Sequence, residues 1–447
     1  MKKLLVIAYY FPPLQASGVF RTLAFVRHLS SLGWDITVLT LQPSDHTVAG
    51  DILMGELSMG VKVVRAKERD IFRLWARMKR DKKGHGLGVK QKPEDGGNAP
   101  GGSSPGILQH WKHQISAFVK TPDSQTGWFF PALVKGIRLQ RPDIIYSSAP
   151  PFTGHVIGAL LKKRWKVPLV IDYRDPWWGN PFRPSYGGWV EKWDNTLEAW
   201  TVQSADCIIA NTDSMAEMLR DRFSHHAKKV ITITNGFDPE EFKDLQSMRE
   251  VPEERLYFVH PGVLYGKRNP LPFLRALRKT IREDMLDNIL VHFIGRSEKF
   301  EGKSLEQHIE DMDLAEHVHL IPPMEHNKVL AVMKGADILL LLALGTTLQV
   351  PAKVFEYMGV GKPIFAVCEE QSATLQLMRQ LGKNHYIALN NVAMIQQQLE
   401  QVYVRWRRNK LYVASGYSQG AKQFFRSHLA GVLNNSFQAL LSTRNQT

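Results

Sequence analysis

The sequence predicts an α/β protein made of two doubly wound domains, and three observations support this prediction. Short apolar strands alternate with helical segments along both halves of the chain, which is typical of parallel sheets covered by helices. The chain has 447 residues, enough for two domains of ordinary size. Its 44% hydrophobic content with 22% charge is typical of a soluble globular protein, and the longest apolar run, Ile338–Leu344, is far below the roughly 20 residues that span a bilayer.

The first half opens as a βαβ unit. Lys3–Tyr9 is predicted as a strand, Ser17–Leu32 as an amphipathic helix and Trp34–Leu41 as the next strand. The beginning, MKKLLVIAYYFPP, mimics a signal peptide, but its apolar part is brief and ends in Pro-Pro, so we interpret it as the first strand. The link PPLQASG lacks G-x-G-x-x-G and does not support a dinucleotide site. Further strands are predicted at Asp143–Ser147, Leu169–Tyr173, Cys207–Asn211 and Val230–Thr234.

The second half repeats this alternation after an Asn-Gly turn in ITNGFDPEEF. We place the boundary near residue 245, which gives domains 1–245 and 246–415 and a long helical segment with a tail at 416–447. Residues 81–106 are rich in Gly, Pro, Ser and charge, so they are predicted to form a disordered surface loop. Strands are predicted near 256–263, 289–294, 317–321, 337–343 and 363–367.

The stretch 335–367, GADILLLLALGTTLQVPAKVFEYMGVGKPIFAV, contains the strongest signal for a ligand site. It is predicted as a strand, a Gly-Thr-Thr turn, a short helix opened near Pro351 and a second strand. Such a unit aims a helix amino end at the carboxyl edge of a parallel sheet, where anions bind. Lys353 and Glu356 are three residues apart and share a helix face. A carboxylate can bind a ribose diol and a lysine can meet a phosphate, although a solvated surface pair is the alternative.

The string PAKVFEYMGVGKPI resembles the donor-site segment of glycosyltransferase family 4, whose members carry a similar K-x-x-E-Y-M-A-x-G-K-P run. In the first half, strings matching P-P-x-x-x-x-G-x-x-R-T, D-S-Q-x-G-W, P-P-F-x-x-H and R-D-P-W are similar to those of family members, so the resemblance covers nearly the whole chain. It implies the GT-B fold, in which two doubly wound domains face a cleft and the last helix crosses back to the first domain. The donor would bind the C-terminal domain and the acceptor the N-terminal one.

The resemblance also implies an activity. The protein would be an enzyme that moves a sugar from a nucleotide-sugar donor to a glycan or a lipid-linked acceptor. Transfer would proceed with retention, without metal or cofactor, in synthesis of a cell-envelope polysaccharide such as lipopolysaccharide or capsule. Two rival functions are an epimerase of sugar nucleotides with the same fold and an inactive scaffold in envelope assembly.

Functional positions transfer from the family residue by residue. The ribose-binding Glu falls on Glu356, and the Lys that neutralises the diphosphate falls on Arg268, beside Lys267. The family's Arg and its second Glu are replaced here by Val263 and Leu348. The predicted catalytic residues are Arg268, Lys267 and Arg174, the donor-binding residues are Glu356, Lys353, Gly345, Thr346, Thr347 and Gly18, and the acceptor-binding residues are Asp175, Trp177, Arg21 and His155.

The acceptor-side residues have structural alternatives. Asp175 and Trp177 suit a sugar because a carboxylate takes hydroxyls and an indole covers apolar C–H faces. A capping aspartate and core tryptophans are the less favoured alternative. Arg21 has the alternative of an exposed first-turn arginine, and His155 that of a satisfied helix histidine.

Metal, P-loop and disulfide sites are not expected. The string GVLYGKR is one residue short of a P-loop and lacks its Ser or Thr. Asp311 and Asp313 form a D-x-D string, but it lies in the predicted helix Ser304–Leu314, where residues two apart do not share a face. Cys207 and Cys368 are far apart in two strands, so a cytoplasmic protein without disulfides is expected.

The net charge of +14 indicates an anionic partner. Lipid surfaces, nucleic acid and sugar nucleotides would all qualify, and the resemblance favours the sugar nucleotide and a membrane over nucleic acid. Basic residues cluster at Lys79–Lys83 and at Lys162–Lys166, where Trp165 adds an aromatic that prefers the headgroup region. We therefore expect peripheral attachment to the inner face of the cell membrane. Solvated charge runs are the alternative.

Overall fold

The computed structural model describes residues 1–14, 17–43, 60–69, 114–181, 183–284, 287–382, 385–411 and 419–444. The chain forms two compact units, one of Met1–Ile208 with Ala439–Thr447 and one of Ile209–Gln438. The boundary near residue 245 remains our proposal for where the acceptor and donor domains divide. The predicted loop 81–106 and the basic run Lys79–Lys83 lie outside the described residues.

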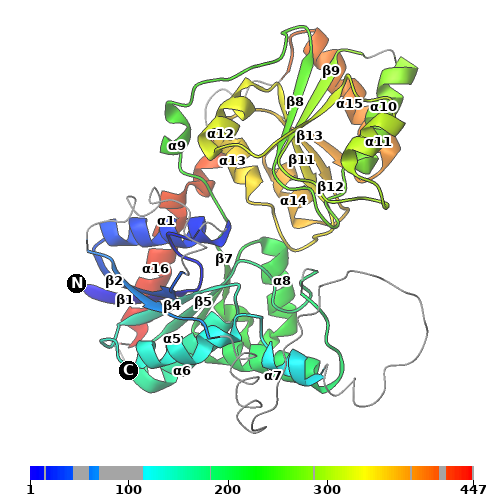
Figure 1. The fold of residues 1–447 in the computed structure, drawn as a ribbon. Helices are drawn as coiled ribbons and strands as arrows, with labels where there is room; N and C mark the ends of the chain where they lie inside the picture. Colours follow the sequence, from blue (N-terminus) through cyan, green and yellow to red (C-terminus); the bar gives the residue numbers. More distant parts are fainter. Residues whose placement is uncertain are drawn as a thin grey trace, which may run out of the picture. The chain divides into compact units, whose positions relative to one another are not determined.

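The first sheet has seven strands in the order β3-β2-β1-β4-β5-β6-β7 (Figure 1). The strand pairs from β3 to β5 are parallel. The chain winds away from β1 on both sides, so β1 and β4 flank a topological switch point, where ligands bind in doubly wound sheets. The strands are β1 Lys2–Ala8, β2 Trp34–Leu41, β3 Lys62–Ala66, β4 Ile144–Ala149, β5 Leu169–Tyr173, β6 Cys207–Ala210 and β7 Val230–Thr232.

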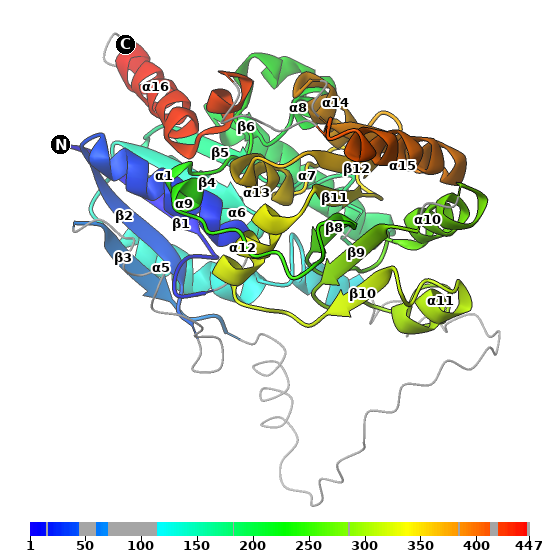
Figure 2. The same ribbon diagram turned by 90° about the horizontal axis from the view of Figure 1, so that it is seen from above.

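Helices cover the first sheet, whose central strands are mostly apolar and buried along their whole length. Every residue of β4 and β5 is buried, as expected for strands covered on both faces. Helix α6 packs on β4, and α5 lies beside both α6 and β3 (Figure 2). The helices whose bounds are described before the second sheet are α1 Ser17–Ser31, α5 Phe129–Ile137, α6 Thr153–Trp165, α7 Gly188–Ser204, α8 Asp213–Arg222 and α9 Glu240–Lys243, with the 3-10 turns η1 Thr126–Trp128 and η2 Ser224–Lys229.

The second sheet has six parallel strands in the order β10-β9-β8-β11-β12-β13. Its side chains alternate between two hydrophobic cores, with Leu339 and Leu341 in one and Leu340 and Leu342 in the other. The predicted α/β class with two doubly wound sheets is therefore confirmed. The strands are β8 Leu256–Pro261, β9 Ile289–Ile294, β10 Val318–Ile321, β11 Ile338–Ala343, β12 Ile364–Cys368 and β13 Tyr386–Leu389.

The long helical segment predicted at the end of the chain is in two parts, the 3-10 turn η3 Gln419–Phe424 and helix α16 Arg426–Arg444. From Ala439 onward the chain belongs to the first unit, although the preceding residues belong to the second. Among the described helices, none is long and apolar enough to cross a membrane. The other helices of this half are α10 Leu271–Asp284, α11 Leu305–Asp311, α12 His326–Gly335, α13 Lys353–Val360, α14 Ala373–Gln380 and α15 Val392–Arg407.

Candidate functional site

Lys353 opens helix α13 and reaches the carboxyl end of strand β8 in the second unit. Its Nζ donates a hydrogen bond to the Pro261 carbonyl. A Cβ placed on Gly262 would lie 1.5 Å from that Nζ, so a side chain there would displace the ammonium group, and the φ of 122° also favours glycine. Because β8 lies at the switch point beside β11, the lysine holds a cation where this sheet class binds ligands.

A second cation lies close to the first. Arg268 follows the β8 turn, and its guanidinium stacks over the Tyr265 ring at 5.0 Å. Burial and the nearby charge of Arg268 lower the pKa of Lys353 to about 8, and the charge of Glu356 only partly opposes them. Two cations from different elements are thus held together at a cost in electrostatic energy. Binding of an anion would relieve this cost.

Glu356 lies one turn after Lys353 on α13, as their spacing predicted. Burial raises its pKa, while the charges of His326 and Lys353 act in the opposite direction. No side chain caps the amino end of α13. A half-buried carboxylate, an ammonium group and an uncapped helix amino end therefore occupy neighbouring turns of one element.

The turn Gly345–Thr347 lies against Lys267. Gly345 has a positive φ of 75°, and a Cβ there would lie 2.2 Å from the Lys267 Cβ, so both conformation and space require glycine. The Gly345 amide donates to Glu369 Oε1 at 3.3 Å, and Thr346 is buried. Glu369 was missed by the sequence analysis, although its place directly after β12 was a usable signal.

In the first unit, Arg21 is a buried ion-pair partner, which corrects both interpretations offered from sequence. Its Nε and Nη2 donate to the two carboxylate oxygens of Asp172 at 2.9 and 3.0 Å. Tyr146 donates to the same carboxylate at 2.5 Å. Arg21 is neither an exposed first-turn residue nor an open contact for an acceptor, since only 7% of its surface is accessible.

Arg174 and Gly18 are brought together at the end of β5. A Cβ on Gly18 would lie 1.8 Å from Arg174 Nη1, so the glycine allows the first turn of α1 to approach the guanidinium. Arg174 also donates to the carbonyls of Ala149 and Pro150, and burial lowers its pKa. The structure thus links two predicted site residues that lie far apart in sequence. Asp175 follows them and is half-buried.

His155 has the structural role that was the alternative from sequence. It has no accessible surface, and its Nδ1 lies 2.8 Å from Ser147 Oγ. Burial lowers the pKa of His155 to about 3, so the ring is neutral. An acceptor cannot touch it in this arrangement, which corrects its predicted role.

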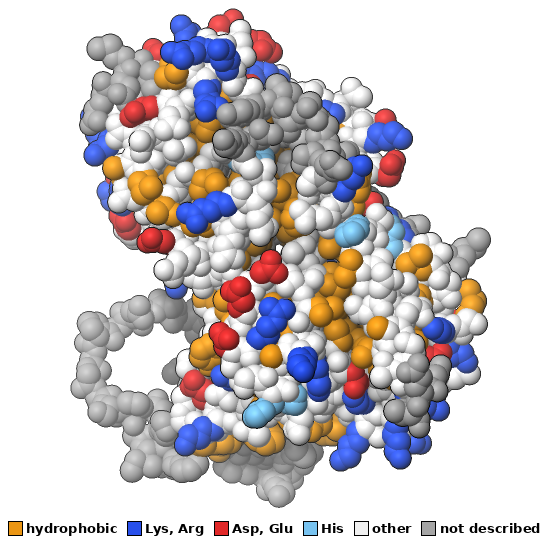
Figure 3. Space-filling view, turned by 180° about the vertical axis from the view of Figure 1, so that it is seen from behind, with side chains coloured by type: hydrophobic (Ala, Val, Ile, Leu, Met, Phe, Trp, Pro, Cys, Tyr) orange, Lys and Arg blue, Asp and Glu red, His pale blue; other side chains and the backbone are white. Residues whose placement is uncertain are grey.

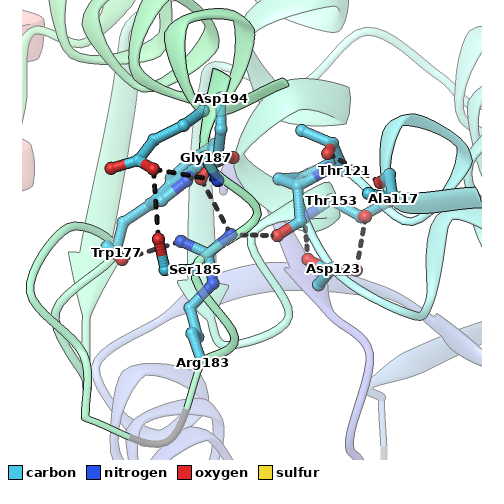
Figure 4. A network of polar contacts seen from close by, with 11 residues as sticks. Ala117, Thr121, Asp123, Thr153, Trp177, Arg183, Ser185, Gly187 and Asp194 are labelled. Carbon is cyan, nitrogen blue, oxygen red and sulfur yellow. Dashed lines mark hydrogen bonds and ion pairs between the residues drawn. The ribbon is translucent and has the colours of Figure 1, made fainter. Parts of the chain in front are cut away.

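Trp177 belongs to a buried network around Arg183 and not to an open acceptor surface. Its ring stacks on Phe152 at 4.6 Å, and its Nε1 donates to Asp194 Oδ1 at 2.9 Å (Figure 4). Arg183 donates to the Trp177 carbonyl at 2.7 Å and to Asp194 at 3.0 Å. Only 2% of Trp177 is accessible, whereas 45% of its neighbour Trp178 is exposed. The exposed indole at this loop is therefore Trp178.

The same network includes the first residue of the D-S-Q-x-G-W string. Asp123 accepts hydrogen bonds from the backbone amide and hydroxyl of Thr153, both at 2.8 Å, at the start of α6 (Figure 4). Arg183 reaches the preceding Pro122 carbonyl. Three strings that are separate in the sequence are thus joined into one rigid support for the loop after β5.

We expect Trp177→Phe to lower the free energy of unfolding by about 1 to 2 kcal/mol, because the ring stack survives while the bond to Asp194 is lost. Urea denaturation measures this loss. Trp178→Phe is the matched control and should leave stability unchanged, since Trp178 is exposed. Equal stability of the two variants would contradict the structural role of Trp177.

The D-x-D string is part of surface ion pairs. Asp311 ends α11 and pairs with Lys303 at 2.6 Å, while Asp313 lies beyond the helix and pairs with Arg282. In the described part of the chain, no group of three or more His, Cys, Asp or Glu residues is placed to hold a metal ion. Cys207 and Cys368 are buried and free.

Comparison with known proteins identifies the family. The family model of Glycosyltransferase Family 4 matches residues 93–241, and that of Glycosyl transferases group 1 matches residues 241–402. This chain belongs to the family 4-like glycosyltransferases. No curated protein sequence matches this glycosyltransferase.

Solved structures share the GT-B fold of this glycosyltransferase. HepE from Anabaena, in complex with UDP and glucose, is 12% identical with a TM-score of 0.60. The match covers 98% of this chain and 100% of the HepE chain. Sucrose-phosphate synthase from Thermosynechococcus elongatus is 11% identical with a TM-score of 0.65, and the match covers 99% of this chain and 100% of the synthase chain. The lipopolysaccharide outer core galactosyltransferase WaaB is 12% identical with a TM-score of 0.57, and the match covers 98% of this chain and 99% of the WaaB chain. At these identities the likeness concerns the fold alone.

The glycosyltransferase departs from the family motif at Val263 and Leu348, and the structure shows what lies beside the first of them. Val263 is 45% exposed and follows Gly262, over which the Lys353 ammonium lies. A cation from α13 therefore lies next to the position where the family has arginine. Lys353 and Arg268 together still provide two positive charges at the end of β8.

We expect the affinity for a nucleoside diphosphate to fall above pH 8. The pKa of Lys353 is about 8 without ligand and would rise beside a diphosphate, so binding takes up a proton above that pH. The dissociation constant should increase by up to about tenfold per pH unit from pH 8 upward and change little just below pH 8. Calorimetric titration with UDP measures this slope.

Two variants separate this effect from other titrations. Lys353→Met should bind more weakly and lose the pH slope, because the titrating group is gone. Lys267→Met should keep the slope, since the contact of Lys267 with Gly345 is made by its carbon chain. A slope that persists in Lys353→Met would rule out this lysine as its source.

Proposed function

We propose that this glycosyltransferase moves a sugar from a nucleotide-sugar donor to a glycan or lipid-linked acceptor in cell-envelope polysaccharide synthesis. The observation that carries the proposal is the convergence of Lys353, Arg268 and Glu356 at the carboxyl end of the second sheet. Two cations suit a diphosphate, and a carboxylate suits the diol of a ribose. The complexes of HepE with UDP and glucose and with UDP-glucose support a nucleotide-sugar donor, and WaaB supports an envelope role.

The proposed chemistry is retaining and independent of metal and of any cofactor. As the bond between the sugar and the diphosphate breaks, negative charge develops on the phosphate oxygens. Arg268, with Lys353 beside it, would stabilise that charge. In other transferases a divalent cation stabilises the leaving diphosphate in the same way. Transfer should therefore continue in the presence of EDTA.

The acceptor side of the proposal rests on the loop after β5. Asp175 is half-buried and Trp178 is 45% exposed, so a carboxylate and an indole lie close to Arg174 in sequence and are partly accessible. The network through Asp123, shown in Figure 4, holds this loop on α6. We propose that Trp178 provides the aromatic contact first assigned to Trp177.

Binding and turnover test the proposal in two steps. A thermal-shift screen over UDP, GDP, ADP and their sugars should single out one nucleotide, because a ligand at 100 times its Kd stabilises the folded state by about 2.7 kcal/mol. Isotope-labelled donor is then incubated with membranes. Glycosylated product supports the proposal, an epimerised nucleotide sugar indicates the epimerase, and nucleotide binding without either product indicates the inactive scaffold.

We also propose that the enzyme works at the inner face of the cell membrane, through the basic cluster at the end of α6. The structure changes which residues of that cluster can take part. Lys162 pairs with Asp206 at 2.5 Å, and Trp165 is only 9% accessible, so neither is presented to lipid. The exposed members are Lys163, Arg164 and Lys166.

A further inference from the structure

Helix α5 presents an apolar stripe on its outer face. Phe130, Val134 and Ile137 are 70%, 46% and 45% exposed, and their spacing of four and three residues aligns them along one side of the helix. Ala132 and Gly136, on the opposite side, are buried. Single exposed apolar residues are normal, but a continuous stripe on one helix indicates an interaction surface.

Basic side chains border the carboxyl end of this stripe. A Cβ on Gly136 would lie 2.9 Å from Leu161 Cδ1, which places the last turns of α5 and α6 side by side. In the view from behind in Figure 3, Lys and Arg side chains gather near the lower edge of the molecule. Arg138 and Arg141 directly follow α5, and Lys163, Arg164 and Lys166 lie at the end of α6. All five are exposed, and we call them the basic border.

We propose that the α5 stripe inserts into the headgroup region of a bilayer containing anionic lipid, with the basic border bound to its phosphates. An apolar helix face next to cations has the chemistry of an interfacial membrane helix. A second copy of the chain fits less well, because a twofold contact across this face would bring two basic borders together. The inference rests on the proposed function only in that a lipid-linked acceptor places the enzyme at a membrane.

Sedimentation with liposomes tests the stripe. The wild-type protein should sediment with vesicles of phosphatidylcholine and phosphatidylglycerol, sediment less at high salt and remain in solution with phosphatidylcholine alone. The double variant Phe130→Ser with Val134→Ser should reduce the partition coefficient about tenfold or more. Val404→Ser is the matched control, because Val404 is also 46% exposed on a helix, and it should bind as the wild type does.

The basic border has a control of the same spacing. Changing Lys163, Arg164 and Lys166 to Gln should also reduce binding about tenfold or more. Changing Arg407, Arg408 and Lys410 to Gln removes three exposed charges at the end of another helix and should reduce binding far less. Equal losses from the two triple variants would show a diffuse charge effect and overturn the assignment of this border.

A fluorescent label tests insertion directly. Ile137→Cys can be labelled selectively, since Cys207 and Cys368 are buried, and its emission should shift to the blue when anionic vesicles are added. The same label at Val404→Cys should not respond. Unchanged emission at position 137, wild-type sedimentation of the stripe variant, or a dimer that Phe130→Ser abolishes would overturn the proposal.

Failure of this inference is distinguishable from failure of the proposed function. Melting temperature and nucleotide binding are measured on every variant without lipid. Both should match the wild type, because the changed side chains are exposed and lie outside the donor site. Intact nucleotide binding without vesicle binding would reject this membrane surface and the attachment through the end of α6, and would leave the proposed sugar transfer untouched.

Discussion

Replacing Arg268 with alanine is expected to lower kcat by roughly 30- to 1000-fold, or about 2 to 4 kcal/mol, while the donor KM changes little. The guanidinium lies close enough to Lys353 to lower the pKa of that lysine, so both cations face the same site. A diphosphate gains negative charge as it leaves the sugar. Loss of the arginine therefore costs more in the transition state than in the bound substrate.

Steady-state kinetics with the donor found in the nucleotide screen checks this expectation. Arg275→Ala is the matched control, because Arg275 is an exposed arginine of the same unit, paired with Glu301 at 2.7 Å. That variant should retain wild-type kcat. A wild-type kcat of the Arg268→Ala enzyme would contradict the catalytic role assigned to this arginine.

Strands with apolar runs between clear breakers could be predicted from sequence. Strand β5 begins and ends at the predicted residues because LVID follows a proline and the next residue after Tyr173 is charged. Strands β3 and β13 were missed. Both are short, and their residues are only partly buried, so neither produces a continuous apolar run.

The placement of Lys353 and Glu356 on one helix face could be predicted because its signal is local. Lys353 and Glu356 lie three residues apart on one helix, and that spacing alone places them on one face. The acceptor side depends on partners that are distant in sequence. Arg21 meets Asp172 across 151 positions, and the burial of Trp177 follows from packing that no local pattern reports.

Glu356→Gln is expected to raise the donor KM by roughly 30- to 1000-fold, or about 2 to 4 kcal/mol, with a much smaller change in kcat. The carboxylate would accept hydrogen bonds from the ribose in substrate and transition state alike, so its loss weakens both by similar amounts. Initial rates at varied donor concentration measure the KM. Glu370→Gln is the control, since Glu370 is exposed in the same unit and should keep the wild-type KM.

Although Glu356→Gln should weaken donor binding, it should not lower the free energy of unfolding of the ligand-free protein. Burial raises the pKa of Glu356, so the folded state binds a proton more tightly than the unfolded state does. Its destabilising contribution therefore develops as pH rises from the unfolded pKa to the folded pKa and is fully present above both. At neutral pH, Gln removes that contribution, and the free protein should melt at the same temperature as the wild type or higher. A variant that binds donor normally, or one that loses donor binding only because it unfolds, would contradict the assignment of Glu356 to the ribose.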